Sequence, residues 1–574
     1  MKQILSYMKK YRVYAILCPL LMVLEVVADV VEPYLMSQIV NNGIVSRDIE
    51  YIVRMGILMV VVALFGMAFG VISAHAGARA GYGFAAEIRK AAFEKIQSYS
   101  FANLDQFTVS SLITRITNDC NILGQVAMMS LRMAVRAPFL MIMALIMSFS
   151  INASLARVFM VAIPITAFSI VIILKKASPL FRRLQSRVDR VNAVIQENLI
   201  GIRVVKSFNR QKFEEKKFKN RNDDLRDTAL KAVSTVILLF PILNLVVYST
   251  IMAVLWFGGK QVSVGNMGSG DLIAFITYIT QVLMSLMMIS MFFMQFLRGV
   301  ASGGRILEVL NTESEIKSPE KAVKEIKDGS ITFKNVSFIY PGSREKVLKN
   351  INFHVDSGET LGIIGSTGSS KSTLVQLIPR LYDVTEGEVL VGGRNVKEYD
   401  LVALRDQVAF VLQKNTLFSG TLRENMKWGK EDATDEEIIE ALKKAQAWEF
   451  VSKYEDGLDH WVEQGGSNFS GGQKQRLCIA RALLKSPKII ILDDSTSAVD
   501  MATDAKIQKT FKEELSHVTK IIIAQRISSI QTANRIIVMH EGEIESIGDH
   551  ETLMNISPIY REIYESQQKG VINQ

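Results

Sequence analysis

Long apolar stretches crowd the first 300 residues of the chain, whereas the later residues alternate between short apolar runs and polar segments. A membrane-spanning helix needs about 20 apolar residues, because it must cross about 30 Å of hydrocarbon. Stretches of this length occupy residues 14–38, 52–78, 131–152, 155–175, 232–258 and 271–297. The pattern therefore predicts a polytopic α-helical membrane domain over residues 1–310, whose six transmembrane helices have cytoplasmic extensions. A polar linker over 311–329 and a soluble α/β domain over 330–574 follow.

Basic residues are unevenly distributed among the segments that connect the six stretches. The two long connections, 79–130 and 176–231, include a run rich in lysine and arginine, whereas the three short connections contain little beyond Arg47, Arg157 and Lys260. Positive charge marks the cytoplasmic side of a membrane protein. We therefore expect both termini and both long connections to be cytoplasmic.

Charge and cysteine content exclude two other classes of protein. The net charge of +9 is compatible with a nucleic-acid partner, but the basic residues lie mainly between apolar stretches, and six spans exclude a soluble nucleic-acid ATPase. The cysteines Cys18, Cys120 and Cys478 are odd in number and far apart, which argues against a disulfide framework. We expect no nucleic-acid partner.

Two patterns inside the predicted spans are open to more than one interpretation. Glu25, Asp29 and Glu32 share one face of the first helix, where they either line a cation-attracting cavity or outer gate, or pair with polar groups on a neighbouring helix or near the outer headgroups. The sixth span has methionines at helical spacing, which form either a flexible substrate wall or ordinary helix packing. These are Met284, Met287, Met288, Met291 and Met294. We favour pairing for the acids and packing for the methionines.

A phosphate-binding loop follows a short apolar strand at residues 361–364. Its residues are Gly365, Ser366, Thr367, Gly368, Ser369, Ser370, Lys371, Ser372 and the following Thr373. In such a loop the glycines let backbone N–H groups approach phosphates, the lysine meets the β- and γ-phosphate oxygens, and the hydroxyl holds Mg²⁺. Ser370 stands where the pattern G-x-x-x-x-G-K-[ST] has its second glycine, so the match depends on its companions.

Two companion motifs follow in the order that an ATPase requires. The apolar strand 488–492 leads into Asp493, which can orient Mg²⁺ through water, and Asp494, which can poise the attacking water. Between the loop and these acids, Ser470-Gly471-Gly472-Gln473 begins a helical run. Backbone amides at that helix start would form an anion site, although not for the phosphate loop of the same chain.

On these motifs, essentially the whole chain resembles the ATP-binding-cassette (ABC) exporters, of the type I fold with an α/β P-loop nucleotide-binding domain. The resemblance implies ATP and Mg²⁺ as cofactors, with Ser372, Gln413 and, through water, Asp493 around the metal. It further implies that Tyr340 stacks on adenine and that Gln413 senses the γ-phosphate. The signature would be Phe469, Ser470, Gly471, Gly472 and Gln473, and the D-loop would include Ser497 and Asp500.

The resemblance also implies how the parts move. Two cassettes would meet head to tail around two ATP molecules, each held by one phosphate loop and the other cassette's signature. Residues 100–105 and 208–213 resemble the coupling helices that carry cassette motion to the spans, and residues 462–466 resemble the exporters' coupling loop with changes at Glu463 and Gln464. Transport would proceed by alternating access.

Three positions around one phosphate depart from the family pattern. Asp494 replaces the usual glutamate and falls about 1.5 Å short, where misplacement by about 1 Å can cost roughly a hundredfold in rate. Gln525 replaces the switch histidine and cannot carry a proton, and Ser370 is the third departure. The chain thus resembles the degenerate-site subunit of a heterodimeric bacterial multidrug-type exporter. Its signature would complete the competent site of a partner that carries the glutamate and histidine.

We therefore expect one subunit of an exporter that moves amphipathic compounds or drugs out of the cytoplasm or inner leaflet of a bacterial cell membrane. Alternatives with the same features are a homodimeric exporter with two slow sites, an engineered hydrolysis-dead variant, a lipid flippase, and an ATP-gated channel or sensor that does not pump. An importer is disfavoured, because its membrane and ATPase parts usually lie on separate chains.

Overall fold

The computed structural model describes residues 2–495 and 497–572, which fold into two compact units. The first unit comprises Met1–Gln97 and Val109–Thr312, and the second comprises Ser98–Thr108 and Glu313–Gln574. The chain therefore leaves the first unit briefly at residues 98–108, adds a short helix to the second unit, and returns.

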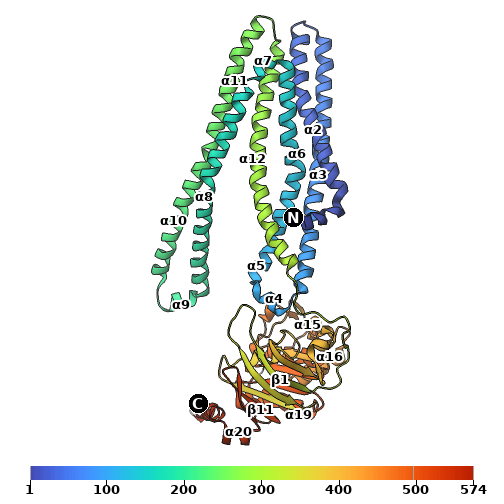
Figure 1. Cartoon of the computed structure of the whole chain (residues 1–574), viewed down its shortest axis with the longest axis vertical. Helices are drawn as coiled ribbons and strands as arrows, with labels where there is room; N and C mark the ends of the chain where they lie inside the picture. Colours follow the sequence, from blue (N-terminus) through green and yellow to red (C-terminus); the bar gives the residue numbers. More distant parts are fainter. Residues whose placement is uncertain (1, 496, 573–574) are drawn as a thin grey trace. The chain divides into compact units, whose positions relative to one another are not determined.

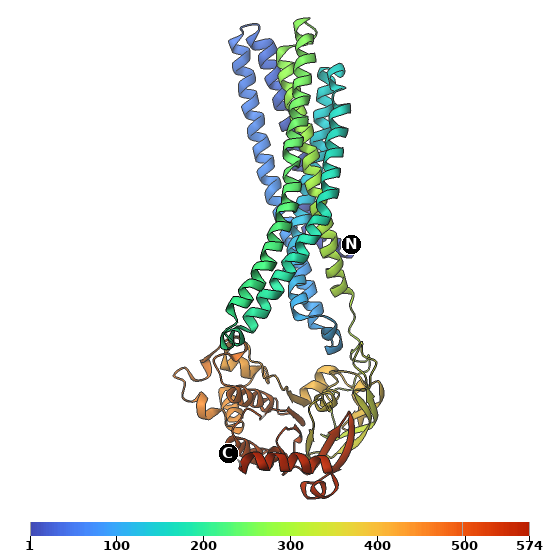
Figure 2. The same cartoon turned by 90° about the vertical axis from the view of Figure 1, so that its left-hand side faces the viewer.

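The first unit consists of long helices that run side by side (Figures 1 and 2). Its helices are α1 (Lys2–Ser6), η1 (Tyr7–Tyr11), α2 (Arg12–Gln38), η2 (Ile39–Ile44), α3 (Ile49–Gln97), α5 (Val109–Thr114), η3 (Arg115–Asp119), α6 (Cys120–Ile151), α7 (Ala153–Ala156), α8 (Phe159–Ile200), α9 (Ile202–Ser207), α10 (Gln211–Ile237), α11 (Leu239–Ser263) and α12 (Ser269–Asn311). Among the described residues, six helical segments are long and apolar enough to cross a membrane, which confirms the six predicted spans. The shortest has 43 residues, or about 65 Å at 1.5 Å per residue, so every segment extends well past the bilayer.

One guanidinium inside the bundle pairs with two of the three acids on α2. The Arg136 guanidinium on α6 pairs with the Glu25 carboxylate and, at 2.8 Å, with that of Asp29. Gln281 on α12 donates a hydrogen bond to the Asp29 backbone carbonyl at 3.0 Å. Ionisable side chains in a membrane span are costly unless they are paired, and pairing with a neighbouring helix is therefore confirmed for Glu25 and Asp29.

The methionine stripe on α12 behaves differently. Met284, Met291 and Met294 are exposed on this unit, with relative accessibilities of 48%, 51% and 46%. Packing inside the unit therefore does not account for these three side chains, and they stay candidates for a substrate wall.

The second unit is built on two sheets. The larger has the order β12-β11-β3-β10-β9-β6, and the smaller has the order β2-β1-β4-β5. The strands are β1 (Ile331–Phe338), β2 (Leu348–Val355), β3 (Thr360–Gly365), β4 (Glu386–Val391), β5 (Arg394–Asn395), β6 (Val408–Val411), β7 (Gly420–Thr421), β8 (Trp461–Val462), β9 (Ile489–Asp493), β10 (Thr519–Ile523), β11 (Arg535–His540) and β12 (Glu543–Gly548). Strands β6, β9, β10, β3 and β11 pair in parallel, so their carboxyl ends meet at one edge. Ligands bind at that edge in open α/β sheets.

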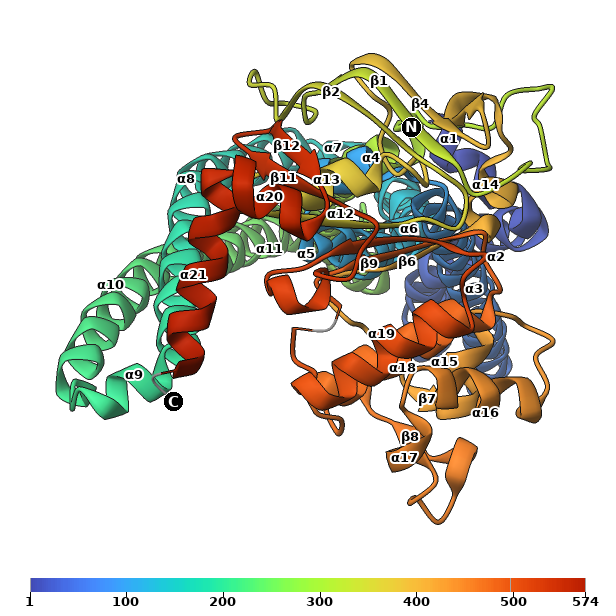
Figure 3. The same cartoon turned by 90° about the horizontal axis from the view of Figure 1, so that it is seen from below.

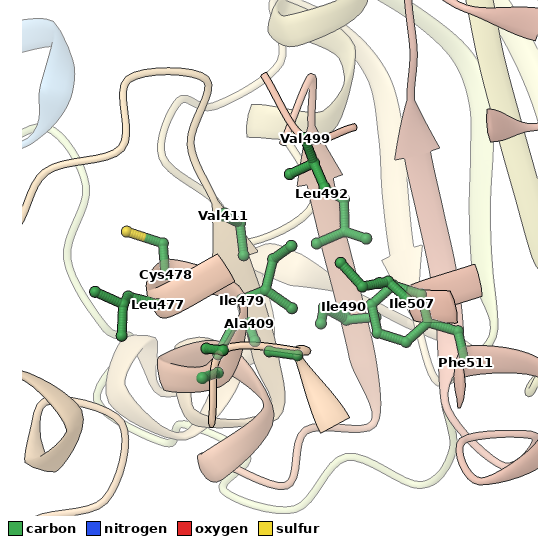
Figure 4. Close-up of a cluster of buried hydrophobic side chains, with 14 of the residues drawn as sticks. Ala409, Val411, Leu477, Cys478, Ile479, Ile490, Leu492, Val499, Ile507 and Phe511 are labelled. Atoms are coloured by element: carbon green, nitrogen blue, oxygen red, sulfur yellow. The ribbon is translucent and has the colours of Figure 1, made fainter. Parts of the chain in front are cut away.

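The central strands are apolar on both faces because both faces are covered. On β9, Ile490 and Leu492 enter one buried cluster, whereas Ile489 and Ile491 enter the other. Figure 4 shows the first cluster, in which β6 and β9 pack against α18 and α19. In Figure 3 these two helices lie on the same side of the strands. Burial of both faces fixes the position of β9 and therefore of the acids at its carboxyl end.

The helices of the second unit connect these strands or follow them. They are α4 (Phe101–Gln106), α13 (Lys371–Gln376), α14 (Leu401–Gln407), α15 (Leu422–Lys427), α16 (Asp435–Lys444), α17 (Trp448–Val451), α18 (Gly471–Leu484), α19 (Met501–Glu513), α20 (His550–Ile556) and α21 (Pro558–Ile572). The short helix expected at residues 100–105 is α4. The other expected coupling helix is displaced, because α9 ends at Ser207 and Asn209 then takes a left-handed φ of 54°.

Helix α4 is held to the second unit by an aromatic side chain that sequence reasoning missed. The Tyr382 hydroxyl donates to the Asp105 carboxylate at 2.6 Å, and the Phe101 ring packs edge-on against the Tyr382 ring with centroids 6.0 Å apart. The Asn103 amide donates to the Glu313 carbonyl at 3.1 Å. A helix of six residues gains little stability from its own backbone, so these contacts hold it in place.

Candidate nucleotide site

The phosphate loop lies where β3 turns into α13, at the carboxyl edge of the sheet. A Cβ on Gly365 would lie 2.2 Å from the Met539 carbonyl oxygen, so only glycine fits there. The Lys371 ammonium donates to the carbonyl oxygens of Gly365 and Ser366 at 2.9 and 2.8 Å, and to the Ser369 hydroxyl at 3.2 Å. Burial lowers the pKa of Lys371, while the nearby charges of Asp493 and Asp494 oppose that shift. The lysine is thus folded across its own loop, within reach of the space that phosphates would take.

Ser370 reproduces the backbone of the glycine that it replaces. Its φ and ψ are 69° and 23°, in the left-handed region, and it stands directly before the first residue of α13. A left-handed conformation costs a residue with a Cβ about 1–2 kcal/mol, whereas glycine adopts it freely. The serine side chain makes no capping hydrogen bond in return. The loop therefore keeps its shape at the expense of local strain.

Two of the three residues expected around Mg²⁺, Ser372 and Asp493, contact each other. Asp493 ends β9 and is 3% exposed, and the Ser372 hydroxyl donates to its carboxylate at 3.0 Å. Burial raises the pKa of Asp493, and the hydrogen bond from Ser372 opposes this. A hydroxyl and a carboxylate beside a phosphate loop are the oxygen ligands that Mg²⁺ prefers, so these residues fit the metal.

Two of the three positions that depart from the family pattern, Asp494 and Gln525, contact each other. The Gln525 amide, just beyond the end of β10, donates to the Asp494 carboxylate at 2.8 Å. Asp494 itself takes a left-handed φ of 50°. Burial raises the pKa of Asp494, while hydrogen bonds from Gln413, Ser497 and Gln525 and the charge of Lys371 lower it. The structure thus brings Gln413 and Gln525 to the same carboxylate, in the position where the family pattern has a base.

Tyr340 stands beside the helix that begins at the phosphate loop. Its hydroxyl lies 2.9 Å from the Thr373 hydroxyl, and its ring packs edge-on against Phe338 and Tyr382 with centroids 4.9 and 5.3 Å apart. An aromatic ring held this firmly next to the loop is suited to stack on a base.

The signature residues form a well-capped helix start. The Ser470 hydroxyl accepts from the Gln473 backbone N–H at 3.3 Å, and the Gln473 side chain accepts from the Ser470 N–H at 2.8 Å, which completes a capping box. Phe469 lies in a cluster with the rings of Tyr454 and His460, at centroid distances of 6.2 and 6.0 Å. This aromatic surrounding explains a phenylalanine where the family has leucine.

The same helix start packs on the D-loop of its own chain. A Cβ on Gly472 would lie 2.8 Å from the Ala498 carbonyl oxygen. Asp500 caps α19 by accepting from the Thr503 N–H at 2.9 Å. Among the described residues, no hydrogen bond joins signature residues 469–473 to phosphate-loop residues 365–373. The structure therefore brings the loop, the acids, Tyr340, Gln413 and Gln525 together, and it joins the signature to the D-loop of the same chain.

Sequence reasoning missed Gln475, which links the signature helix to the acids. It is 5% exposed; its side-chain oxygen accepts from the Ala498 N–H at 3.0 Å, and its amide donates to the Asp494 carbonyl and Ser497 hydroxyl, both at 3.4 Å. The available signal was a glutamine on the apolar face of α18, one turn before the buried Ile479. A polar side chain in such a position requires partners.

Comparisons with known proteins agree over both units. Residues 15–286 match the family described as the ABC transporter transmembrane region, and residues 348–497 match the family described as ABC transporter. The chain is 38% identical over 567 residues to the uncharacterized ABC transporter ATP-binding protein YfiB of Bacillus subtilis, covering 99% of this chain and 98% of that one.

Two further relatives have more specific descriptions. An ATP-dependent lipid A-core flippase of Syntrophus aciditrophicus is 31% identical over 485 residues, which are 84% of this chain and 80% of the flippase. The solved structure of a bacterial Atm1-family ABC exporter with ATP bound is similar with a TM-score of 0.81 at 25% identity, covering 97% of this chain and 98% of the other.

Proposed function

Because this chain belongs to the ABC transporters, we propose that it is one subunit of a heterodimeric ATP-driven exporter whose own nucleotide site is degenerate. The six-helix membrane domain fused to an ATPase domain is a half-transporter architecture, and such exporters act as dimers in the bilayer. The substrates proposed are amphipathic compounds, moved outward across a bacterial inner membrane, with both termini in the cytoplasm.

The observation that carries the proposal is the hydrogen bond from Gln525 to the Asp494 carboxylate. A general base needs a free lone pair within hydrogen-bonding reach of the water that it activates. Here the carboxylate is one methylene short, and Gln525, which donates to one of its oxygens, cannot take up a proton as a histidine can. Both changes act against hydrolysis at this site.

Nucleotide binding depends on other residues, and these support retention of ATP. Lys371 reaches across the phosphate loop, and Ser372 and Asp493 would hold Mg²⁺. When bound, Mg²⁺ neutralises charge on the β- and γ-phosphate oxygens. A site that binds ATP without hydrolysing it favours the closed state of the cassettes for as long as the nucleotide stays bound.

Hydrolysis is proposed to occur at the other site, which this chain completes with its signature. Helix α18 has 14 residues, and its N-terminus at Ser470 presents backbone N–H groups and the positive end of the helix dipole. The capping box orders this helix start. The partner would supply the phosphate loop, a glutamate at the position of Asp494 and a histidine at that of Gln525.

The test is co-purification of this chain with a half-transporter encoded beside it, followed by hydrolysis assays on the 1:1 complex. We expect Asp494→Ala to leave most of the ATPase rate, and substitution of the partner's catalytic glutamate by glutamine to abolish it. If this chain alone forms a dimer with ordinary turnover that Asp494→Ala abolishes, the heterodimer proposal is wrong and the homodimeric alternative replaces it.

A lipid flippase is the second candidate, favoured by the relatives described as ATP-dependent lipid A-core flippases, at 31% and 30% identity. The two functions separate in proteoliposomes. Headgroup-labelled lipid that changes leaflets on addition of ATP supports a flippase, whereas ATP-dependent accumulation of an amphipathic dye without lipid movement supports a drug exporter. Flux that persists without hydrolysis at either site would instead indicate a channel.

A further inference from the structure

The C-terminal helix α21 reaches the loop that follows β10. It is anchored near its beginning by Tyr560, which is fully buried and whose hydroxyl lies 2.8 Å from the His550 imidazole. About two turns later the Gln567 side chain meets the loop residues 525–527. In Figure 3 this helix is the long red one labelled α21.

Gln567 makes two backbone hydrogen bonds, one on each side of Arg526. Its side-chain oxygen accepts from the Ile527 N–H at 3.0 Å, and its amide nitrogen donates to the Gln525 carbonyl at 2.7 Å. One side-chain amide thus supplies both an acceptor and a donor, as a neighbouring strand would. Gln525 is otherwise exposed, beyond the end of the sheet.

These bonds continue to the nucleotide site through a single residue. The backbone of Gln525 is held by Gln567, while its side chain donates to the Asp494 carboxylate at 2.8 Å. The same loop is also tied to the D-loop, because the Arg526 guanidinium donates to the Ser497 carbonyl at 3.2 Å. Fixing the backbone on both sides of Arg526 restricts the directions in which the Gln525 side chain can point.

We propose that Gln567 is a positioning residue, through which the C-terminal helix holds loop residues 525–527 so that Gln525 faces Asp494 and the nucleotide. The inference rests on the proposed assignment of Gln525 as the residue that contacts the γ-phosphate. Displacement of α21 would release the loop and weaken ATP retention at this site without altering the phosphate loop itself.

The test uses the full-length chain in lipid nanodiscs, with Gln567→Met as the variant and Gln568→Met as the matched control. Methionine keeps the length of the side chain but removes both hydrogen bonds. Gln568 is the next residue on the same helix, and its side chain is exposed. Hydrogen exchange of the Ile527 amide reports the contact directly, and equilibrium binding of MgATP reports its consequence.

We expect the Ile527 amide to exchange at least about tenfold faster in Gln567→Met than in Gln568→Met, because the backbone N–H of this buried residue loses its partner. The Kd for MgATP should rise about threefold to tenfold. In a Gln525→Ala background, Gln567→Met should add nothing further, because the two residues act through one path. If Gln567→Met acted only by destabilising the fold, its effect on the Kd would add in full to that of Gln525→Ala.

Other results of these experiments would contradict the proposal or the assignment of Gln525 on which it rests. Equal Ile527 exchange in the two methionine variants overturns the proposal, and so does full additivity with Gln525→Ala. If Gln525→Ala leaves the Kd unchanged while Ile527 exchange still rises in Gln567→Met, the loop contact is supported and the proposed role of Gln525 fails.

A third variant covers the case in which Gln567→Met does not fold. Gln567→Glu keeps the acceptor for the Ile527 N–H but places a carboxylate against the Gln525 carbonyl. We expect Ile527 protection to persist and MgATP binding to weaken. Unchanged binding in this variant would contradict the proposal.

Discussion

Ser370 offers a direct measurement of strain in the nucleotide loop, because its left-handed backbone (φ 69°, ψ 23°) is one that glycine adopts at little cost. Ser370→Gly removes the side chain without breaking a capping hydrogen bond, since the serine makes none. The backbone bond from the Leu374 N–H to the residue 370 carbonyl, at 3.1 Å, is retained. The substitution therefore changes conformational energy and little else.

The expected magnitude follows from two opposing terms. Relief of the left-handed conformation is worth about 1–2 kcal/mol. Glycine also gives the unfolded chain more freedom, which takes back about 0.4–1 kcal/mol. The net stabilisation is about 0–1.6 kcal/mol, which corresponds to a rise in Tm of about 2–4 °C per kcal/mol for a unit of this size.

Thermal unfolding and MgATP binding of the full-length chain provide the assay, with Gly368→Ser as the reverse substitution. Gly368 has a φ of 85°, and a Cβ there would meet nothing within 4 Å, so serine adds strain without a clash. We expect Ser370→Gly to raise the Tm and Gly368→Ser to lower it. ATP hydrolysis at this site should stay unchanged in Ser370→Gly, because Asp494 and Gln525 are intact. A lower Tm in Ser370→Gly would refute the strain argument, and restored hydrolysis would refute the assignment of degeneracy to the other two positions.

Three further predictions concern the site and its connection to α4. Asp494→Glu combined with Gln525→His should raise ATP hydrolysis at this site about tenfold to a hundredfold, since misplacement by about 1 Å can cost that much. The rate of phosphate release measures this, in a complex whose partner glutamate is disabled. Tyr382→Phe removes the 2.6 Å hydrogen bond to Asp105, a bond to a charged group worth about 1.5–3 kcal/mol, and should reduce substrate-stimulated ATPase activity more than basal activity. Burial raises the pKa of Asp493, so the native site binds more protons than the unfolded chain. The contribution of Asp493 to stability is therefore present below the ordinary pKa of an aspartate and is lost as pH rises through the raised pKa. Because Mg²⁺ needs the ionised carboxylate, the affinity for MgATP should fall on acidification more steeply in the native chain than in Asp493→Asn. Titration calorimetry at several pH values measures this difference.

The architecture could be predicted from the sequence because the length of apolar stretches and the order of motifs are local signals. Six long apolar stretches predicted six spans, and the strand that leads into Gly365 and the one that ends at Asp493 could be found from their apolar runs alone. The helical periodicity of the long connections predicted that the helices continue past the bilayer, but not the residue at which each helix ends. Helix α3 continues to Gln97 through polar residues, because a helix outside the bilayer needs no apolar run once a neighbour packs against it.

What the sequence could not supply are contacts between residues far apart in the chain. Arg136 neutralises Glu25 across 111 positions, and Gln567 holds the backbone of Gln525 across 42. Glutamine and arginine side chains are common on surfaces, and no spacing rule distinguishes those that find a distant partner. The left-handed backbone of Ser370 was also hidden, because the loop around it dictates that conformation.

The contact between Asp494 and Gln525 links two of the three departures from the family pattern. Gln525 donates to the Asp494 carboxylate, so the two changed side chains act on the same oxygen atoms. An imidazole N–H at position 525 could donate to that carboxylate as well. The glutamine therefore differs from the histidine of the family pattern in being unable to take up a proton. A carboxylate that is one methylene short, beside a glutamine that cannot take up a proton, is poorly placed to activate water. Such a site favours a role in holding ATP, and it leaves hydrolysis to a site that this chain completes through the helix starting at Ser470.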